Sequence, residues 1–421
     1  MTASSGSPRR LNRRVKIAHV EVGGTLGGSS VCVDVYLRFC GNCFDHDLLF
    51  YSIPHERKLE CGDRFVIRDL HLPVPVTRSG TATRRSIKSS LKKIPIMRTI
   101  ARSVLRCLRA ARYLINAITI ARTLAAGKYD IVHCNNNFDY QPATVIGAWL
   151  ARKPLVVHYR TPLPISAFGR WLGRRAIAIV AINKNVAEHL VRQGIEDRVV
   201  VCADPCEVRD VSRSQALRNE LLGSGHSVLV GSVARLEKNK GVEVFLRAVH
   251  QLRESFPRVK YIIVGSGSEI NSLRTLASEL GLDQSIQFTG FVADAFEYLA
   301  CMDLFVCSSH VEGGPLTVLE AMRLGIPVVT TDVGSVKEWI PRPEYGLVVS
   351  PGDPVILAHA IGRLLADRRC RLTIGDNAKR LAGEFCNPLR AAEELDLVFS
   401  SVADHATLHP LSDLGGNVPR H

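Results

Sequence analysis

The sequence predicts an α/β protein with two doubly wound domains that face each other across a cleft. Short apolar strand patterns alternate with amphipathic helix patterns along most of the chain, as they do in parallel α/β domains. A polar linker at residues 204–225 interrupts this alternation, and the same rhythm then restarts. A chain of 421 residues is long enough to give each domain its own hydrophobic core.

The first domain is predicted over residues 15–203. Its expected strands are almost entirely apolar, which indicates burial on both faces, and they are 15–22, 46–53, 129–135, 153–160, 176–183 and 197–204. Expected helices include residues 31–40 and 186–195. Residues 1–14 are basic and have no apolar segment behind them, so we expect a disordered tail rather than a secretory signal.

The second domain is predicted over residues 226–383. Its expected strands are 228–236, 259–267, 286–292, 303–309, 326–329 and 346–351. Its expected helices are 240–256, 268–282, 295–302, 315–324 and 354–369. A C-terminal helical segment at 384–404 and a tail at 405–421 complete the chain.

The composition fits a globular protein without a membrane span. No apolar run reaches the roughly 20 residues that a spanning helix needs. The twelve cysteines are scattered, so they do not form the pattern of a disulfide framework. The pair Cys40 and Cys43 lacks the second pair that a zinc site needs. We therefore expect a reduced, cytoplasmic protein without a metal site.

The net charge of +14 is unevenly distributed. No acidic residue lies between Asp69 and Asp130, whereas Lys and Arg recur through residues 78–114. From Pro95 onward apolar residues recur at helical spacing between the arginines. A basic amphipathic helix suits an anionic membrane surface, and it is equally the pattern of a domain helix with a solvated basic face. The lack of interleaved aromatic residues argues against nucleic acid.

The predicted carboxyl ends of the strands carry glycine turns and two cations. Ligands of doubly wound domains bind at this edge. Glycine lets backbone N–H groups and a helix N-terminus approach an anion, although a tight turn needs glycine for steric reasons alone. The glycines in question are Gly23, Gly24, Gly27, Gly28, Gly265, Gly267, Gly313 and Gly314. Arg235 and Lys240 follow another strand end, and two cations there suit a diphosphate.

Two glutamates, Glu312 and Glu320, flank the start of one predicted helix. Pro315 fits the first helical position, and Gly325 lies just past the helix end. Glu312 is then expected at the helix mouth and Glu320 about a turn and a half inside. A carboxylate can accept hydrogen bonds from both hydroxyls of a vicinal diol such as ribose. The segment therefore suits a sugar nucleotide.

With these motifs, the second domain resembles the C-terminal domain of retaining glycosyltransferases of the GT-B fold, family 4 (glycosyl transferases group 1). Arg235 and Lys240, "IIVGSGSE", "FTGFV", the spaced glutamates with "EAMRLGIPVV", and "DVGSVKEWI" occur in the family's order. The first domain matches more loosely, through the glycine pair after its first strand, "YDIVHCN" and "KPLVVHYR". The resemblance implies two Rossmann-like domains. It also implies metal-independent transfer of a sugar from a nucleotide-diphosphate sugar, with the anomeric configuration retained and no cofactor.

The family's functional residues map onto matching positions of this sequence. Arg235 and Lys240 would hold the diphosphate and Glu320 the ribose hydroxyls. Glu312 would contact the transferred sugar. Further donor contacts would come from Gly27, Gly28, Gly265, Gly290, Phe291, Val292, Gly313, Gly314, Pro315 and Leu316.

The first domain departs from the family at one position. Many relatives have a histidine where this chain has Arg160, and His158 lies two residues earlier on the same face of the predicted strand. His158 is the candidate to replace the catalytic histidine, whereas Arg160 could bind an anionic acceptor. The basic surface favours a lipid-linked or polysaccharide acceptor.

A second interpretation is an inactive relative that binds a nucleotide sugar or a membrane surface. The intact donor motifs favour an enzyme, while the altered strand end at Arg160 leaves an inactive binding module as the alternative. Asp45–Asp47 has the Asp-x-Asp form of metal-dependent transferases, but it leads into a strand rather than out of one.

Overall fold

The computed structural model describes residues 14–23, 28–53, 65–73, 95–207, 209, 211–223 and 225–408, with the backbone alone for residues 95–109 and 405–408. Gly27 and the predicted tails before residue 14 and after residue 408 lie outside the described residues. The basic region predicted at 78–114 is described only from Pro95 onward.

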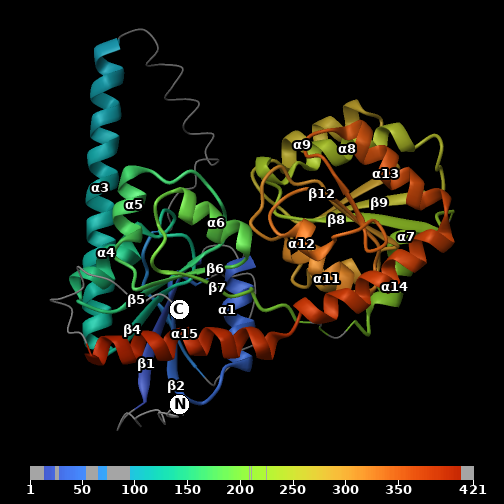
Figure 1. Cartoon of the computed structure of the whole chain (residues 1–421). Helices are drawn as coiled ribbons and strands as arrows, with labels where there is room; N and C mark the ends of the chain where they lie inside the picture. The colour runs from blue at the N-terminus through green and yellow to red at the C-terminus, as the bar shows by residue number, and fades with distance from the viewer. Residues whose placement is uncertain are drawn as a thin grey trace, which may run out of the picture.

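Two α/β domains make up the described chain, each built on a parallel sheet (Figure 1). The N-terminal sheet has seven strands in the order β3-β2-β1-β4-β5-β6-β7. Their bounds are β1 Val15–Gly23, β2 Phe44–Ser52, β3 Val66–Asp69, β4 Ile131–Cys134, β5 Leu155–Tyr159, β6 Ala178–Ala181 and β7 Val199–Val201. The chain moves outward from β1 to β3 and then in the opposite direction from β4 to β7. This confirms the doubly wound fold.

The sequence patterns do not reveal β3. Its residues alternate between exposed and half-buried positions because it forms the edge of the sheet. A strand of that kind has no continuous apolar run, which is the signal that identified its neighbours.

The helices of the N-terminal domain cover both faces of its sheet. They are α1 Gly28–Phe39, α3 Pro95–Ala126, α4 Pro142–Leu150, α5 Ala167–Gly173 and α6 Lys184–Arg192. One apolar core lies on the side of α3 and α4, and the other lies under α1.

The C-terminal sheet has six strands in the order β10-β9-β8-β11-β12-β13. Their bounds are β8 Val228–Val233, β9 Val259–Val264, β10 Ile286–Gly290, β11 Leu304–Cys307, β12 Val328–Thr331 and β13 Leu347–Val349. The helices around it are α7 Ser214–Leu222, α8 Val242–Leu252, α9 Ile270–Glu279, α10 Ala295–Ala300, α11 Leu316–Leu324, α12 Val336–Trp339, α13 Pro354–Ala366 and α14 Arg368–Phe385. Helix α14 was not predicted, and a short 3₁₀ turn, η3 Lys238–Lys240, precedes α8.

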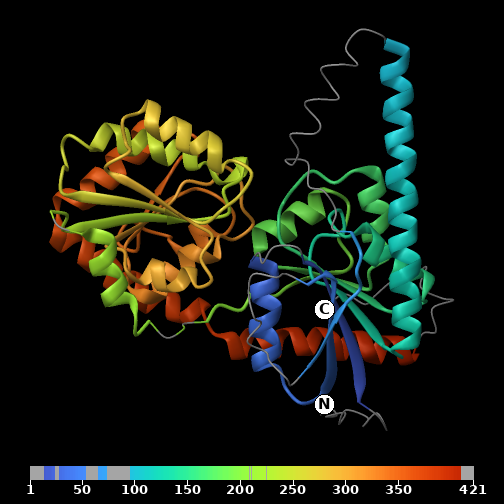
Figure 2. The ribbon, with the colours of Figure 1, turned by 180° about the vertical axis from the view of Figure 1, so that it is seen from behind.

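The last helix, α15 Pro388–Leu408, returns to the N-terminal domain (Figures 1 and 2). Its Phe399 is fully buried against the sheet, in the same apolar core as Tyr36 of α1. The hydroxyl of Tyr36 donates to Asp396 Oδ1 at 2.5 Å, and the backbone N–H of Gly41 donates to Asp396 Oδ2 at 3.0 Å. The two domains are therefore joined twice, through the linker before β8 and through the segment between α14 and α15.

Helix α3 packs on the domain through its C-terminal half. Ala117, Ile120 and Leu124 are fully buried, and α4 lies against them. Residues 110–115 are exposed, and the N-terminal part of the helix projects beyond the rest of the domain in both views (Figures 1 and 2). Among the described residues, no helix combines the length and apolarity needed to cross a bilayer.

Candidate active site

The loop after β8 carries the two predicted phosphate-binding cations. It is held in place by the loop after β9, because Leu236 N–H donates to the carbonyl of Ser266 at 2.8 Å. A Cβ on Gly265 or Gly267 would clash with the carbonyl oxygens of Ala234 and Leu236. These two glycines are therefore required for the close approach of the two loops, which agrees with the structural role that the turn suggests by itself.

Lys240 follows β8, and Glu312 follows the neighbouring strand β11. The two side chains form an ion pair. Their side chains are 17% and 15% exposed, so the pair is mostly shielded from solvent. Ser309 donates its hydroxyl hydrogen to Glu312 Oε1 at 3.0 Å, and His310 contacts Glu243 at 2.7 Å beside them. The carboxylate of Glu312 thus lies within reach of the Lys240 ammonium, as a donor site shared by the two residues requires.

Arg235 is the more open of the two cations. Its side chain is 52% exposed, and its Nη1 lies 3.7 Å from Glu237 Oε1. Burial raises the pKa of Tyr140, which follows β4 in the N-terminal domain, and the charge of Arg235 partly offsets that rise. Arg235 therefore faces the N-terminal domain.

Helix α11 begins one residue later than predicted. Pro315 is its N-cap, with an extended ψ of 94°, and Leu316 is the first helical residue. The predicted end is confirmed, since Gly325 closes the helix in the left-handed conformation with φ 78°. Glu312 precedes the N-terminus, and Glu320 lies just over one turn inside the helix.

The N-terminus of α11 faces the N-terminal domain. A Cβ on Gly28, the first residue of α1, would lie 3.7 Å from Leu316. Burial raises the pKa of the Cys32 thiol in α1, and the charge of Glu320 adds to that rise. The start of α1 and the start of α11 therefore lie against each other across the domain boundary.

The loop predicted to frame the base follows β10. Gly290 has φ 74°, which favours glycine, and its carbonyl accepts from Gly265 N–H at 2.9 Å. Phe291 is 43% exposed, and Val292 is partly buried in the core beside α11. The glycine turns after β9 and β10 are thus linked directly.

Arg160 lies in a buried polar network at the carboxyl edge of the N-terminal sheet. Its guanidinium pairs with Asp204 and donates to Asn135 Oδ1 at 2.9 Å. Asn135 in turn donates to Glu21 Oε2 at 2.6 Å. Burial raises the pKa of Glu21, and the hydrogen bond from Asn135 partly offsets that rise. Because its guanidinium is engaged inside the protein, Arg160 organises this edge rather than presenting a free cation.

The sequence patterns do not reveal the partners of Arg160. Asn135 directly follows β4, Glu21 lies two residues before the end of β1, and Asp204 lies three residues past the end of β7. A polar residue near the end of an apolar strand was therefore the available signal. Their pairing joins positions far apart in the chain, and no local pattern contains that information.

His158 shares a sheet face with Arg160, as predicted, but it lies one layer deeper. Its side chain is 3% exposed, and its Nε2 lies 3.4 Å from Asp204 Oδ1. Burial lowers the pKa of His158, and the charge of Arg160 lowers it further. In this structure the imidazole does not reach a surface where a donor could touch it, because Arg160 and Asp204 occupy the strand ends beside it.

Three more buried histidines continue this layer across the sheet. His19 Nδ1 lies 2.8 Å from His133 Nδ1, and His19 Nε2 lies 2.9 Å from His46 Nδ1. The rings of His133 and His158 are 5.6 Å apart. Burial lowers the pKa of His19 and of His133, and neighbouring histidines lower both further. His19, His133 and His158 are therefore neutral at neutral pH.

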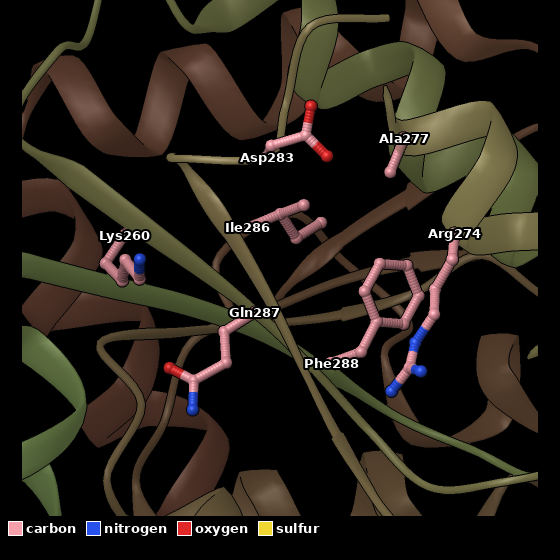
Figure 3. Close-up of a pocket in the computed structure, with 7 residues that line it drawn as sticks. All are labelled: Lys260, Arg274, Ala277, Asp283, Ile286, Gln287 and Phe288. Atoms are coloured by element: carbon pink, nitrogen blue, oxygen red, sulfur yellow. The ribbon is translucent and has the colours of Figure 1, made fainter. Parts of the chain in front are cut away.

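A shallow pocket of about 380 Å³ lies away from these residues (Figure 3). It opens between the starts of β9 and β10 and helix α9, and its lining is Lys260, Arg274, Ala277, Asp283, Ile286, Gln287 and Phe288. The predicted site occupies the opposite, carboxyl ends of the same strands. This pocket is therefore not part of it.

Within the described ranges, no cluster of three or more His, Cys, Asp or Glu side chains has the form of a metal site. Cys40 is buried at the end of α1 and Cys43 is exposed, and both are free thiols. Asp45 and Asp47 lie at the start of β2, far along the strand from its carboxyl end.

Two family profiles match the chain, one in each domain. The profile of Glycosyl transferases group 1 matches residues 214–381, and that of Glycosyltransferase Family 4 matches residues 76–203. Two similar curated proteins are the lipopolysaccharide core biosynthesis glycosyltransferase LpsE of Rhizobium meliloti and the putative glycosyltransferase EpsD of Bacillus subtilis. LpsE is 28% identical, with 57% of this chain and 71% of LpsE covered. EpsD is 26% identical, with 66% and 78% covered.

Solved structures share the fold at low sequence identity. The Anabaena protein HepE, solved in complex with UDP-glucose, superposes with a TM-score of 0.72 at 20% identity, over 92% of this chain and all of HepE. The sucrose-phosphate synthase of Thermosynechococcus elongatus gives a TM-score of 0.70 at 17% identity, over 93% of this chain and all of the synthase. The two-domain GT-B fold is thereby confirmed.

Proposed function

The chain belongs to the group 1 glycosyltransferases, a family of GT-B enzymes that transfer a sugar from a nucleotide sugar, and from this premise we propose a specific reaction. It moves a sugar from a nucleotide-diphosphate sugar to a lipid-linked or polysaccharide acceptor, with the anomeric configuration retained and without a metal ion. The observation that carries this proposal is the Lys240–Glu312 ion pair, next to the N-terminus of α11 and on the side that faces Gly28 of the other domain.

The donor would lie along α11. Lys240 and Arg235 would bind the diphosphate, and Gly313, Gly314 and Leu316 would offer their backbone N–H groups at the helix N-terminus. Glu320 would accept hydrogen bonds from the ribose hydroxyls. Glu312 would exchange its partner Lys240 for hydroxyls of the transferred sugar.

The chemistry needs stabilisation of the leaving group. The bond between the anomeric carbon and the diphosphate oxygen breaks, and the acceptor oxygen bonds to the same face of that carbon. The acceptor proton passes to the departing diphosphate. Two fixed cations neutralise the negative charge that develops on the diphosphate, which is the role that a metal ion plays in other transferases. His158, buried beneath Arg160, would act by supporting the strand end rather than by touching the sugar.

The acceptor and location proposals rest on α3. Its exposed segment carries large apolar side chains, with Leu114 and Ile115 54% and 62% exposed. The surrounding sequence has no acidic residue between Asp69 and Asp130. We propose that this helix binds the anionic inner face of a membrane from the cytoplasm, where a lipid-linked acceptor would be presented. The similarity to LpsE supports an acceptor in cell-surface polysaccharide synthesis.

The test uses purified full-length protein and the UDP, GDP and ADP forms of common sugars. We expect one donor to raise the melting temperature and to be slowly hydrolysed without added metal. Glu320→Ala should abolish both effects, whereas Glu279→Ala at the exposed end of α9 should change neither.

Donor binding without hydrolysis or transfer would favour the inactive binding module instead. For α3, co-sedimentation with phosphatidylglycerol-containing vesicles should exceed that with phosphatidylcholine alone. Equal binding to both would contradict the membrane proposal.

A further inference from the structure

The loop that carries Glu312 is held by the opposite domain. Asn183 of the N-terminal domain donates its side-chain N–H to the carbonyl of Gly313 at 2.7 Å. The two residues are 130 positions apart in the chain, and the side chain of Asn183 is buried. This contact therefore exists only while the two domains are together.

The same side chain also caps helix α6. Its Oδ1 accepts from Val186 N–H at 2.8 Å, which is the usual N-cap contact. Because Oδ1 meets a backbone donor and Nδ2 meets a backbone acceptor, the two contacts together fix the orientation of the amide. One atom of Asn183 serves its own helix, and the other serves the partner domain.

The backbone around Gly313 leaves no room for a side chain at Gly313 or at Gly334. A Cβ on Gly313 would clash with the carbonyl of Arg160, and a Cβ on Gly334 would clash with the carbonyl of Gly313. Gly334 has φ 55°, so glycine suits that position on two grounds. Asn185 donates to the carbonyl of Gly334 at 3.2 Å and holds that neighbouring turn in the same way.

The helices behind these turns also face each other. Burial raises the pKa of Glu338 in α12, with Lys184 of α6 lowering it and Glu188 of α6 raising it. Together with the contacts of Asn183 to Gly313 and of Asn185 to Gly334, this places the starts of α6 and α12 close to each other across the domain boundary.

We propose that Asn183 is a positioning residue that sets the peptide between Gly313 and Gly314 when the two domains close. In a trans peptide the C=O and the following N–H point in opposite directions. Anchoring the Gly313 carbonyl to Asn183 therefore fixes the direction of the Gly314 N–H, which is one of the donors at the mouth of α11. The donor loop would then take its binding conformation at the same time as the two domains close.

The contribution of Asn183 to catalysis rests on the proposed transferase function, but its contact with Gly313 does not. If the domains separated, Gly313 would lose both Asn183 and its packing against Arg160. Glu312, the residue before it, would then be free to adopt other positions beside Lys240. The site would be complete only in the closed form.

The experiment separates the two roles of Asn183 by substitution. Asn183→Ser keeps an N-cap oxygen but is too short to reach Gly313, and Asn183→Asp keeps the shape and the cap but cannot donate. Ser166→Ala is the matched control, because Ser166 caps α5 in the same domain by accepting from Gly169 N–H, and Ser166 is exposed.

Hydrogen–deuterium exchange of the full-length protein is the first measurement. In Asn183→Ser and Asn183→Asp, we expect the amides of Glu312, Gly313, Gly314 and Leu316 to exchange at least tenfold faster, while the amides of α6 stay protected. Ser166→Ala should leave residues 312–316 unchanged. Unchanged exchange there in both Asn183 variants would overturn the proposal.

Kinetics give the second measurement, with the best donor found in the screen. We expect kcat for transfer to fall at least tenfold in both Asn183 variants, with a smaller change in KM. Equal kcat in wild type and both variants would also overturn the proposal. Faster exchange in a protein that turns over no donor would retain the positioning role and reject the proposed function instead.

Discussion

Replacing Glu312 by Gln tests how the ion pair and the donor share Lys240. In the free protein Lys240 is paired with Glu312, so a bound diphosphate must compete with that carboxylate and lie near it. Glu312→Gln removes the competing charge with little change in shape. We therefore expect the variant to bind the nucleoside diphosphate product more tightly, although it transfers sugar more slowly.

The magnitude follows from the geometry of the pair. A phosphate in contact with Lys240 would lie about 6 Å from the carboxylate, where two unit charges at an effective dielectric constant of about 20 repel by roughly 3 kcal/mol. Partial exposure of the pair, with side chains 17% and 15% accessible, screens this value. We expect a net gain of about 1 to 3 kcal/mol, which corresponds to roughly 5- to 150-fold tighter binding.

Isothermal titration calorimetry with UDP, GDP and ADP measures this directly. Glu243→Gln is the matched control, because Glu243 carries the same charge beside the site but pairs with His310 instead. Tighter binding of one diphosphate in Glu312→Gln, with no change in Glu243→Gln, supports the shared-cation arrangement. Weaker or unchanged binding in Glu312→Gln would refute it.

Three further outcomes follow from the packing and from the buried charges. Gly313→Ala should force its loop away from the carbonyl of Arg160, so small-angle scattering should show a more open average shape. An unaltered scattering profile would contradict that close contact. Phe399→Ala empties a fully buried position under α15 and should lower the free energy of unfolding by about 3–5 kcal/mol in urea titrations. A loss below about 1 kcal/mol would mean that α15 contributes little to the N-terminal domain. Lowering the pH should destabilise the protein, because a histidine whose folded pKa is lowered contributes nothing above its unfolded pKa of about 6.5, where it is neutral in both states, and opposes folding below that pKa. The histidines concerned are His19, His133 and His158. The raised pKa values of the carboxyls of Glu21, Asp139, Glu338 and Asp396 act in the opposite sense, but of these four only Glu21 is buried, whereas all three histidines are buried. The free energy of unfolding from urea titrations should therefore fall between pH 7.5 and pH 5.5 by more than a single group supplies, which is about 1.4 kcal/mol per pH unit. A higher midpoint at pH 5.5 would contradict this assignment.

The donor side of the site was readable from the sequence because its signals are local. A strand, a glycine turn and a helix with two spaced glutamates occupy one continuous segment, and the structure brings Glu312 to Lys240 across adjacent strand ends. The shift of the helix start to Leu316 comes from the extended ψ of Pro315, which a sequence rule does not specify.

The N-terminal domain was less readable because its arrangement depends on contacts between distant residues. The two-residue alternation of side chains along a strand correctly placed His158 on the same face as Arg160. It does not show how deeply His158 is buried below the edge of the sheet. Asp204, which occupies that edge, was assigned to the linker region. The contact of Asn183 with Gly313 has no local signature, because the N-cap pattern accounts fully for an asparagine at that position.

Binding of a nucleotide sugar by the wild type and by Lys240→Met is the most direct test of the donor site. Calorimetry should detect one nucleotide sugar that binds the wild-type protein without added metal. Its affinity should fall by roughly 10- to 100-fold in Lys240→Met, since a hydrogen bond to a charged group contributes about 1.5–3 kcal/mol. Binding that is equally tight in Lys240→Met, or no binding of any nucleotide sugar to the wild type, would contradict a donor held by Lys240 at the mouth of α11.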